Sequence, residues 1–180
     1  MRAVLLLCSA LAIAAPVSAQ TPAASPAAAA LVRQWIERVN ALSDQPATLD
    51  AFVALFAPDA LVTTGPTADQ RGTVTYRGAS GLRTFASRLA AREHERSYRL
   101  ESETARESTA SLLHETSGPW GGPAVAVQIV AAYTDASTGT RYVVPGAAFF
   151  QMSGGTIRRL RLYFGEGERA EVEAPPKKKP

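Results

Sequence analysis

The chain has 180 residues, of which 46% are apolar and 19% charged, and its formal net charge is +3 at pH 7. This mixture is typical of one globular domain and excludes extensive disorder and collagen-like repeats. The one cysteine, Cys8, lies in an N-terminal segment that we expect to be removed. A disulfide framework, a cysteine-based zinc site and a cysteine nucleophile are therefore excluded for the mature protein.

The N-terminus has the three parts of a secretory signal peptide. Arg2 supplies the positive start, an apolar run follows, and small residues precede a cleavage site after Ala19. We predict a signal peptide at residues 1–19 and export of the mature chain to the periplasm or the medium. Residues 20–29 are rich in alanine and proline and are predicted to be a linker. No later stretch is apolar enough to predict a membrane span.

The next part of the chain predicts three helices and a short hairpin. Apolar residues recur at helical spacing from Ala30 to Leu42 and predict the first helix. Thr48 is predicted to cap a second helix whose apolar face extends to Phe56, and Pro58 to end that helix or start a turn. Short strands are predicted at 60–64 and 73–77, with a loop at 65–72 between them. A third helix is predicted to open at residues 78–80.

After His94 the hydrophobic period changes to two, which is typical of strands. Strands are predicted at 98–104, 109–115, 124–133, 140–152 and 157–164, with a loop at 116–123 and a turn at 135–139. The charged, proline-rich residues 166–180 are predicted to be a disordered tail. Helices followed by antiparallel strands predict an α+β domain at residues 30–165.

The long strands are rich in small residues, among them Gly146, Ala147 and Ala148. Small residues allow a sheet to bend closely around its contents. Three helices packed on a strongly curved antiparallel sheet would leave a conical cavity, which is a common site for a small ligand.

Four stretches occur in a characteristic order: LVRQWIERVN at 31–40, LFAPDALV at 55–62, YRG at 76–78 followed by Leu82 and Phe85, and GTIRRLRLYF at 155–164. Together they resemble the nuclear transport factor 2-like superfamily, which includes ketosteroid isomerases and SnoaL-like polyketide cyclases. The resemblance spans roughly residues 30–164. It implies the cone-shaped fold described above and a homodimer formed through the exposed sheet face, with Arg159 and Arg161 at its edge.

The resemblance to ketosteroid isomerases does not extend to their acid–base residues. It implies a tyrosine where this chain has Trp35, a carboxylate base at Thr64, and a second acid near Ala148. A threonine hydroxyl is far too weak a base for proton abstraction, and alanine offers no acid. We therefore expect no steroid-type isomerisation.

His114 is the best remaining candidate for acid–base chemistry, because histidine titrates near neutrality. Its neighbour Glu115 would point to the opposite face of a strand, so the two cannot enter one pocket together. His114 is either a proton carrier, helped by Tyr98 or Tyr76, or a histidine at the rim or surface. His94, which lies among charged residues, is predicted to be solvated.

Other kinds of site find little support. Asp59 is predicted to be structural. Two histidines twenty residues apart and no mature cysteine predict no metal site, and no cofactor motif is present. The chain has no basic stripe with interleaved aromatic residues, so nucleic-acid binding is not expected.

Three hypotheses remain open. The first is an exported domain that binds a small apolar molecule, the second a SnoaL-like isomerase, cyclase or dehydratase that uses His114, and the third a dimeric structural or interaction module with a filled core. The predicted ligand pocket is lined by Trp35, Phe56, Val62, Thr64, Tyr98, Val127, Ile129, Ala148, Phe150 and Met152.

Overall fold

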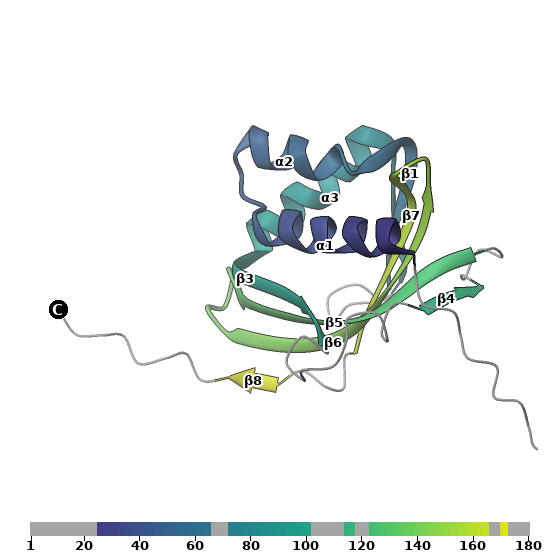
Figure 1. Cartoon of the computed structure of the whole chain (residues 1–180). Helices are drawn as coiled ribbons and strands as arrows, with labels where there is room; N and C mark the ends of the chain where they lie inside the picture. The colour runs from purple at the N-terminus through teal and green to yellow at the C-terminus, as the bar shows by residue number, and fades with distance from the viewer. Residues whose placement is uncertain (1–24, 66–71, 102–113, 118–122, 166–169, 173–180) are drawn as a thin grey trace, which may run out of the picture.

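The computed structural model describes residues 25–65, 72–101, 114–117, 123–165 and 170–172. Three helices, α1 (Pro26–Asn40), α2 (Pro46–Val53) and α3 (Gly78–Arg92), lie on one side of a curved sheet (Figure 1). None of the helices in these residues is long and apolar enough to cross a membrane. The strands are β1 (Phe56–Thr64), β2 (Val74–Arg77), β3 (Glu93–Leu100), β4 (His114–Ser117), β5 (Pro123–Asp135), β6 (Arg141–Ser153), β7 (Thr156–Phe164) and β8 (Ala170–Val172).

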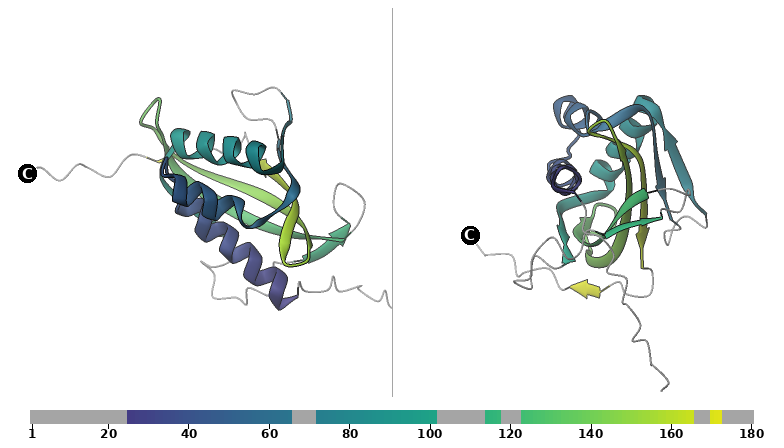
Figure 2. Two further views of the ribbon diagram at one scale, coloured as in Figure 1. Left: turned by 90° about the horizontal axis from the view of Figure 1, so that it is seen from above. Right: turned by 45° about the vertical axis from the view of Figure 1, so that its right-hand side comes forward.

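The sheet has the strand order β2-β1-β7-β6-β5-β3, with β4 paired to β5 and β8 paired to β6. These pairings are antiparallel except that of β1 with β7, which is parallel, so the sheet is mixed rather than purely antiparallel. The long strands β5 and β6 bend beneath α1, and the helices cross the concave face (Figures 1 and 2). The predicted α+β class with three helices on a curved sheet is confirmed.

The first helix begins at Pro26, inside the segment predicted to be a linker at residues 20–29. Ser25 has extended backbone angles, and its hydroxyl accepts a hydrogen bond from the Ala28 amide at 3.3 Å. Proline is tolerated in the first turn of a helix, where its missing N–H would have no partner, and alanine is the strongest helix former. The same alanine- and proline-rich composition that predicted a linker therefore starts the helix.

The boundary between α2 and β1 also differs from the prediction. The helix begins at Pro46, so Thr48 lies inside it and does not cap it; its hydroxyl instead donates to the carbonyl of Gln45 at 2.9 Å. Phe56 starts β1 rather than ending the helix. Pro58 lies within β1, in the stretch where pairing to β7 is irregular, which is where a strand tolerates a residue without an N–H.

The remaining strands agree with the prediction, with differences at three places. β3 begins at Glu93 rather than at the predicted residue 98. β4 includes Thr116 and Ser117, which were predicted to belong to a loop. β8 lies within the tail predicted to be disordered and pairs with β6, with Arg141 opposite Val172. The predicted signal peptide at residues 1–19 and residues 102–113, where strand ends were predicted, lie outside the described residues.

The hydrophobic core lies between the helices and the concave face of the sheet. α1 contributes Trp35, α2 contributes Phe52, α3 contributes Leu82 and β6 contributes Phe150, all completely buried. The alternation along β7 shows how the sheet divides its faces, since Leu160 and Leu162 are buried in the core while the intervening positions are not.

Candidate ligand-binding site

The residues predicted to line a pocket come together in the fold. All of them except Thr64 and Met152 belong to one buried cluster under the helices: Trp35, Phe56, Val62, Tyr98, Val127, Ile129, Ala148 and Phe150. Met152 is half-buried and packs against this cluster, and Thr64 is half-buried at the end of β1.

Strand register explains why residues distant in sequence meet on the concave face. Thr64, Leu162, Ala148 and Val127 pair in one row across β1, β7, β6 and β5. Directly paired residues project from the same face of a sheet. The positions at which ketosteroid isomerases are expected to carry acids, Thr64 and Ala148, therefore share one row of the site, and neither is an acid.

Trp35 places a polar group, its indole N–H, in this apolar cluster. It lies on the inner side of α1, and its side chain is completely buried. Its ring meets Phe150 edge-on at 5.3 Å between centroids and Tyr98 at 6.2 Å. The indole Nε1 is buried and has no hydrogen-bond partner within the described part of the chain. A buried donor without an acceptor destabilises a fold by about 1–3 kcal/mol, so this N–H is an unused binding group.

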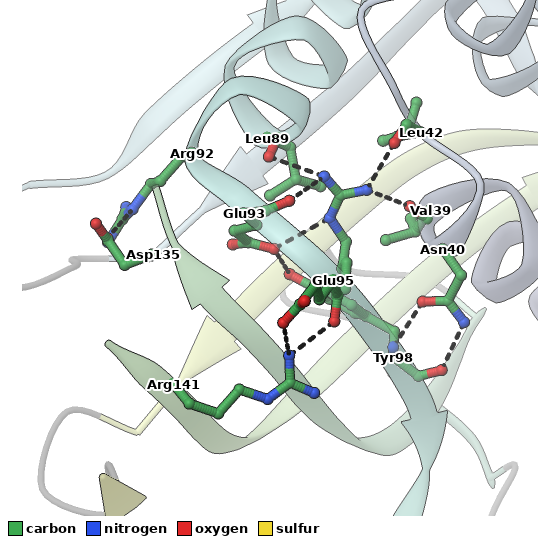
Figure 3. Close-up of polar contacts among 11 residues, drawn as sticks. Val39, Asn40, Leu42, Leu89, Arg92, Glu93, Glu95, Tyr98, Asp135 and Arg141 are labelled. Carbon is green, nitrogen blue, oxygen red and sulfur yellow. Dashed lines mark hydrogen bonds and ion pairs between the residues drawn. The ribbon is translucent and has the colours of Figure 1, made fainter. Parts of the chain in front are cut away.

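A buried acid that the sequence did not reveal lies beside this site. Glu93, the first residue of β3, is only 8% exposed, and its Oε2 accepts a hydrogen bond from the Tyr98 hydroxyl at 3.1 Å (Figure 3). Burial raises the pKa of Glu93 to about 7, although the nearby Arg96 guanidinium acts in the opposite direction. The same burial, together with Glu93, raises the pKa of Tyr98 well above its usual value, so the tyrosine stays protonated.

Arg96 holds the surrounding elements together. Its guanidinium donates to the carbonyls of Val39 at 2.8 Å and Leu42 at 3.2 Å, at the end of α1, and to those of Leu89 at 3.0 Å and Glu93 at 2.8 Å. Its Nε lies 3.4 Å from Glu93 Oε2, an ion pair without hydrogen-bond geometry. The Val39 carbonyl also accepts from the Leu42 amide and the Leu89 carbonyl from the Glu93 amide, so Arg96 adds a further hydrogen bond at the end of each helix.

Regular alternation along a strand would place Glu93 and Arg96, three residues apart, on opposite faces. The pairing of β3 with β5 is irregular between His94 and Ser97, and Glu95 has a positive φ of 48°. This bulge lets both side chains turn inward, which is why period-two reasoning missed them. The one available signal was an acid and an arginine three residues apart directly after a helix.

The predicted acid–base candidates His94 and His114 belong to β3 and β4. His94 is exposed, as predicted. The register places His114 opposite Ala126 of β5; Ala126 is half-buried, whereas its neighbours Val125 and Val127 are buried in the core. Asp59 is exposed and pairs with Arg158 at 3.0 Å.

Comparisons with known proteins agree with this architecture. Residues 32–160 match the family described as the SnoaL-like domain. A search among curated proteins finds no match.

Three solved structures illustrate the similarity of fold. The epoxide hydrolase/cyclase-like enzyme SalBIII, from polyether salinomycin formation, is 20% identical, with a TM-score of 0.54 over 79% of this chain and 94% of its own. An NTF2-like protein of unknown function from Exiguobacterium sp. 255-15 is 10% identical, with a TM-score of 0.55 over 76% and 98%. A computationally designed 17-OHP binder is 17% identical, with a TM-score of 0.56 over 86% and 100%. At these identities the similarity establishes the fold alone.

Proposed function

Because the chain belongs to the SnoaL-like domain family, we propose that it is an exported protein that binds a small, mainly apolar molecule between its helices and the concave face of its sheet. Binding without the acid–base chemistry of ketosteroid isomerases is supported by Thr64 and Ala148, which stand in one row of that face and carry no acid. The designed 17-OHP binder with a similar fold supports the use of this architecture for small molecules.

The observation that carries the proposal is the buried Trp35 N–H without a partner. A ligand with a carbonyl or ether oxygen would accept this hydrogen bond and remove the penalty of leaving it unmade. The edges of Tyr98 and Phe150 around the indole favour a flat or ring-shaped apolar body. The expected ligand is therefore apolar, with one acceptor oxygen.

The proposal is tested with two probes of nearly equal shape, 2-acetylnaphthalene and 2-ethylnaphthalene, of which only the first has an acceptor oxygen. Thermal shift measures binding, and the indole N–H resonance of Trp35 in a ¹⁵N-labelled sample reports on the hydrogen bond. We expect the ketone to raise Tm more than the hydrocarbon and to move the Trp35 resonance downfield. Equal responses to both probes would refute the role of the N–H, and no response across a library of apolar ketones would refute the binding function.

Export is tested independently of binding. Protein recovered from the periplasm or the medium should begin at Gln20, the residue after the predicted signal peptide. Recovery of the chain only inside the cell with Met1 retained would contradict this part of the proposal.

An enzyme of the SnoaL-like kind, predicted to use His114 as its proton carrier, is the second candidate, and the buried Glu93 also favours it. A carboxyl group with a pKa of about 7 can give or take a proton at neutral pH. It is bonded to Tyr98, whose ring contacts Trp35. In an isomerase, cyclase or dehydratase, this pair would exchange the proton with a ligand held at Trp35.

The two candidates are separated by incubating the protein with each probe that binds and following the probe by chromatography and NMR. A product that forms with the wild type and not with Glu93→Gln supports catalysis. A probe that is recovered unchanged supports binding alone.

The proposal includes a homodimer through the outer face of the sheet. Tyr163 is 36% exposed there, its ring meets Phe149 edge-on at 5.9 Å, and the Arg161 guanidinium lies over it at 5.1 Å from the centroid. Aromatic residues and arginine are enriched in protein interfaces, which supports pairing at this place. The remaining alternative is a structural or interaction module that forms this dimer and has a filled core.

A further inference from the structure

A cavity of about 500 Å³ lies outside the apolar cluster around Trp35. Of the residues predicted to line the ligand pocket, it includes only Met152. Its other walls come from β1, β2, β6 and β7 and are mostly polar. The lining residues are Asp59, Leu61, Arg77, Gln151, Met152, Ser153, Arg158 and Arg159.

The floor of this cavity is formed by residues that strand pairing brings into one row. Arg77, Leu61, Arg159 and Gln151 pair in one row across β2, β1, β7 and β6. Residues paired in this way project from one face. Leu61 is adjacent to Val62, which is completely buried in the core, so this row occupies the opposite, outer face of the sheet.

Two irregularities of pairing meet at one point beside this row. The register of β1 against β7 shifts between Phe56 and Leu61, and that of β6 against β7 shifts between Gln151 and Met152. Both shifts flank Arg158, which is left without a regular partner in either pairing. Bulges re-aim side chains and are common next to functional sites. Here they place Arg158 and Asp59 in the wall of the cavity.

The described part of the cavity lining carries three arginines and one aspartate, so positive charge predominates among these residues. Arg158 Nη2 lies 3.0 Å from Asp59 Oδ2. The hydrogen bond from Arg158 holds the pKa of Asp59 below its usual value, and the charges of Arg158 and Arg77 act in the same direction. Asp59 therefore stays ionised and offsets only part of the positive charge.

The geometry points to a binding site for a small molecule that carries an oxyanion, either a phosphate or a carboxylate group. Guanidinium groups present forked donors that match both kinds of oxyanion. Gln151 and Ser153 add neutral donors. The volume lies within the range of small-molecule pockets and exceeds that of a simple anion, so the charged group belongs to a larger ligand, whose body contacts Leu61 and Met152. This site is independent of the proposed apolar site.

The test is a titration of the ¹⁵N-labelled protein with inorganic phosphate and, separately, with citrate, at constant ionic strength maintained with sodium chloride. We expect saturable shifts of backbone amides in β1, β6 and β7 around Leu61, Gln151 and Arg158. Saturation by phosphate alone or by citrate alone identifies the class of oxyanion. Shifts that are spread evenly over exposed arginines, or that do not saturate, would overturn the proposal.

The fold offers a matched control for each charge. Arg83 and Asp50 form another exposed ion pair between two elements, with side chains 48% and 57% exposed against 52% and 67% for Arg158 and Asp59. Neither Arg83 nor Asp50 lines the cavity. Substitutions at the two pairs therefore change the net charge equally and the cavity unequally.

We expect Arg158→Gln to weaken oxyanion binding about tenfold, the loss typical of one charge-assisted contact. Asp59→Asn should strengthen binding, because it removes the competing carboxylate and releases Arg158. Arg83→Gln and Asp50→Asn should leave the affinity within about twofold of the wild type, since they alter only the distant field. If each control changes the affinity as much as its counterpart, binding follows net charge and the site does not exist.

Discussion

Trp35 and Glu93 are two buried polar groups whose surroundings differ. The indole N–H of Trp35 has no partner among the described residues, whereas the Glu93 carboxyl has both Tyr98 and Arg96. The first group is available to a ligand and the second is held by the protein. Each of these two groups leads to a prediction of its own.

Replacing Trp35 by phenylalanine removes the N–H and keeps an aromatic ring. We expect Trp35→Phe to abolish the advantage of 2-acetylnaphthalene over 2-ethylnaphthalene in the thermal-shift assay, because one hydrogen bond contributes about 0.5–1.5 kcal/mol. Trp120→Phe, at the other tryptophan of the chain, is the control and should keep the advantage. A preference for the ketone that survives Trp35→Phe would contradict the assignment.

The raised pKa of Glu93 predicts a pH dependence of stability. The carboxyl binds its proton more tightly in the folded protein, with a pKa of about 7, than at its ordinary value of 4.5. The folded state therefore holds more protons between these values, and the contribution of Glu93 to stability is lost as pH rises from 4.5 to 7.

Glu93→Gln removes this titration. The free energy of unfolding of the wild type, measured by urea denaturation, should fall relative to that of the variant by at most about 3 kcal/mol between pH 4.5 and 7, and should stay constant above that range. Glu37→Gln, at an exposed glutamate of α1, is the matched control. Parallel pH profiles of the wild type and Glu93→Gln would contradict the burial effect.

At the scale of the elements, the Arg96 side chain links the end of α1, the end of α3 and the start of β3. Arg96 donates to carbonyls of both helices, and the Asn40 amide pairs with the Tyr98 backbone at the exposed edge of β3, at 2.9 and 2.6 Å. An edge strand otherwise leaves its backbone groups unpaired. These contacts fix β3 against the helices.

Arg96→Lys tests this arrangement with the charge preserved. An ammonium group cannot reach carbonyls spread around a planar fork, so we expect a loss of about 2–4 kcal/mol in the free energy of unfolding. Arg83→Lys, in an exposed ion pair, should change stability by less than about 0.5 kcal/mol. Similar losses for the two variants in urea denaturation would show that the contacts of Arg96 do not stabilise the fold.

The close approach of β6 and β7 depends on Gly146 of β6. A Cβ atom at this position would lie 2.6 Å from the carbonyl oxygen of Tyr163 and 2.7 Å from the ring of Phe164. Gly146→Ala should therefore destabilise the protein by about 1–3 kcal/mol, because backbone atoms of β7 must move. Gly72→Ala, with open space around its Cβ, should change the free energy of unfolding by less than about 0.5 kcal/mol. Equal effects in denaturant would mean that the close approach is unimportant.

At the scale of the whole molecule, the two faces of the sheet have separate roles. The concave face packs against the helices, where Trp35 of α1 contacts Tyr98 and Phe150 of the sheet. The outer face carries the arginine-lined cavity near the turn between β6 and β7 and, further along β7, the aromatic pair of Phe149 and Tyr163. The proposed ligand under the helices, the proposed oxyanion and the proposed partner subunit are therefore assigned to different places.

Tyr163→Asp tests the proposed dimer by placing a charge in its interface. We expect the wild type to sediment as a dimer and the variant as a monomer, since an unpaired buried charge opposes association. Gln34→Asp introduces the same charge on the exposed side of α1 and should leave the dimer intact. A monomeric wild type would contradict the dimer and also the structural-module alternative.

The sequence predicted most elements because their signals are local. Helical spacing located α1, alternation located β5 and β6, and Gly154-Gly155 marked the turn before β7. Errors occurred where a local signal has two meanings, as for proline at the start of α1 and within β1. Most of the predicted pocket residues are buried together because core-facing periodicity identifies buried side chains.

Local order along the chain therefore determined the α+β class, the three helices and the apolar composition of the concave face. Only the tertiary structure decided which buried polar atoms lack a hydrogen-bond partner and which groups have a shifted pKa. Burial of the Trp35 N–H depends on the packing of α1 against Tyr98 and Phe150. The inward turn of Glu93 and Arg96 and the arginine-lined cavity depend on bulges and on register between distant strands. Desolvation and hydrogen bonding act through these spatial neighbours, which the spacing of residues along one chain does not encode.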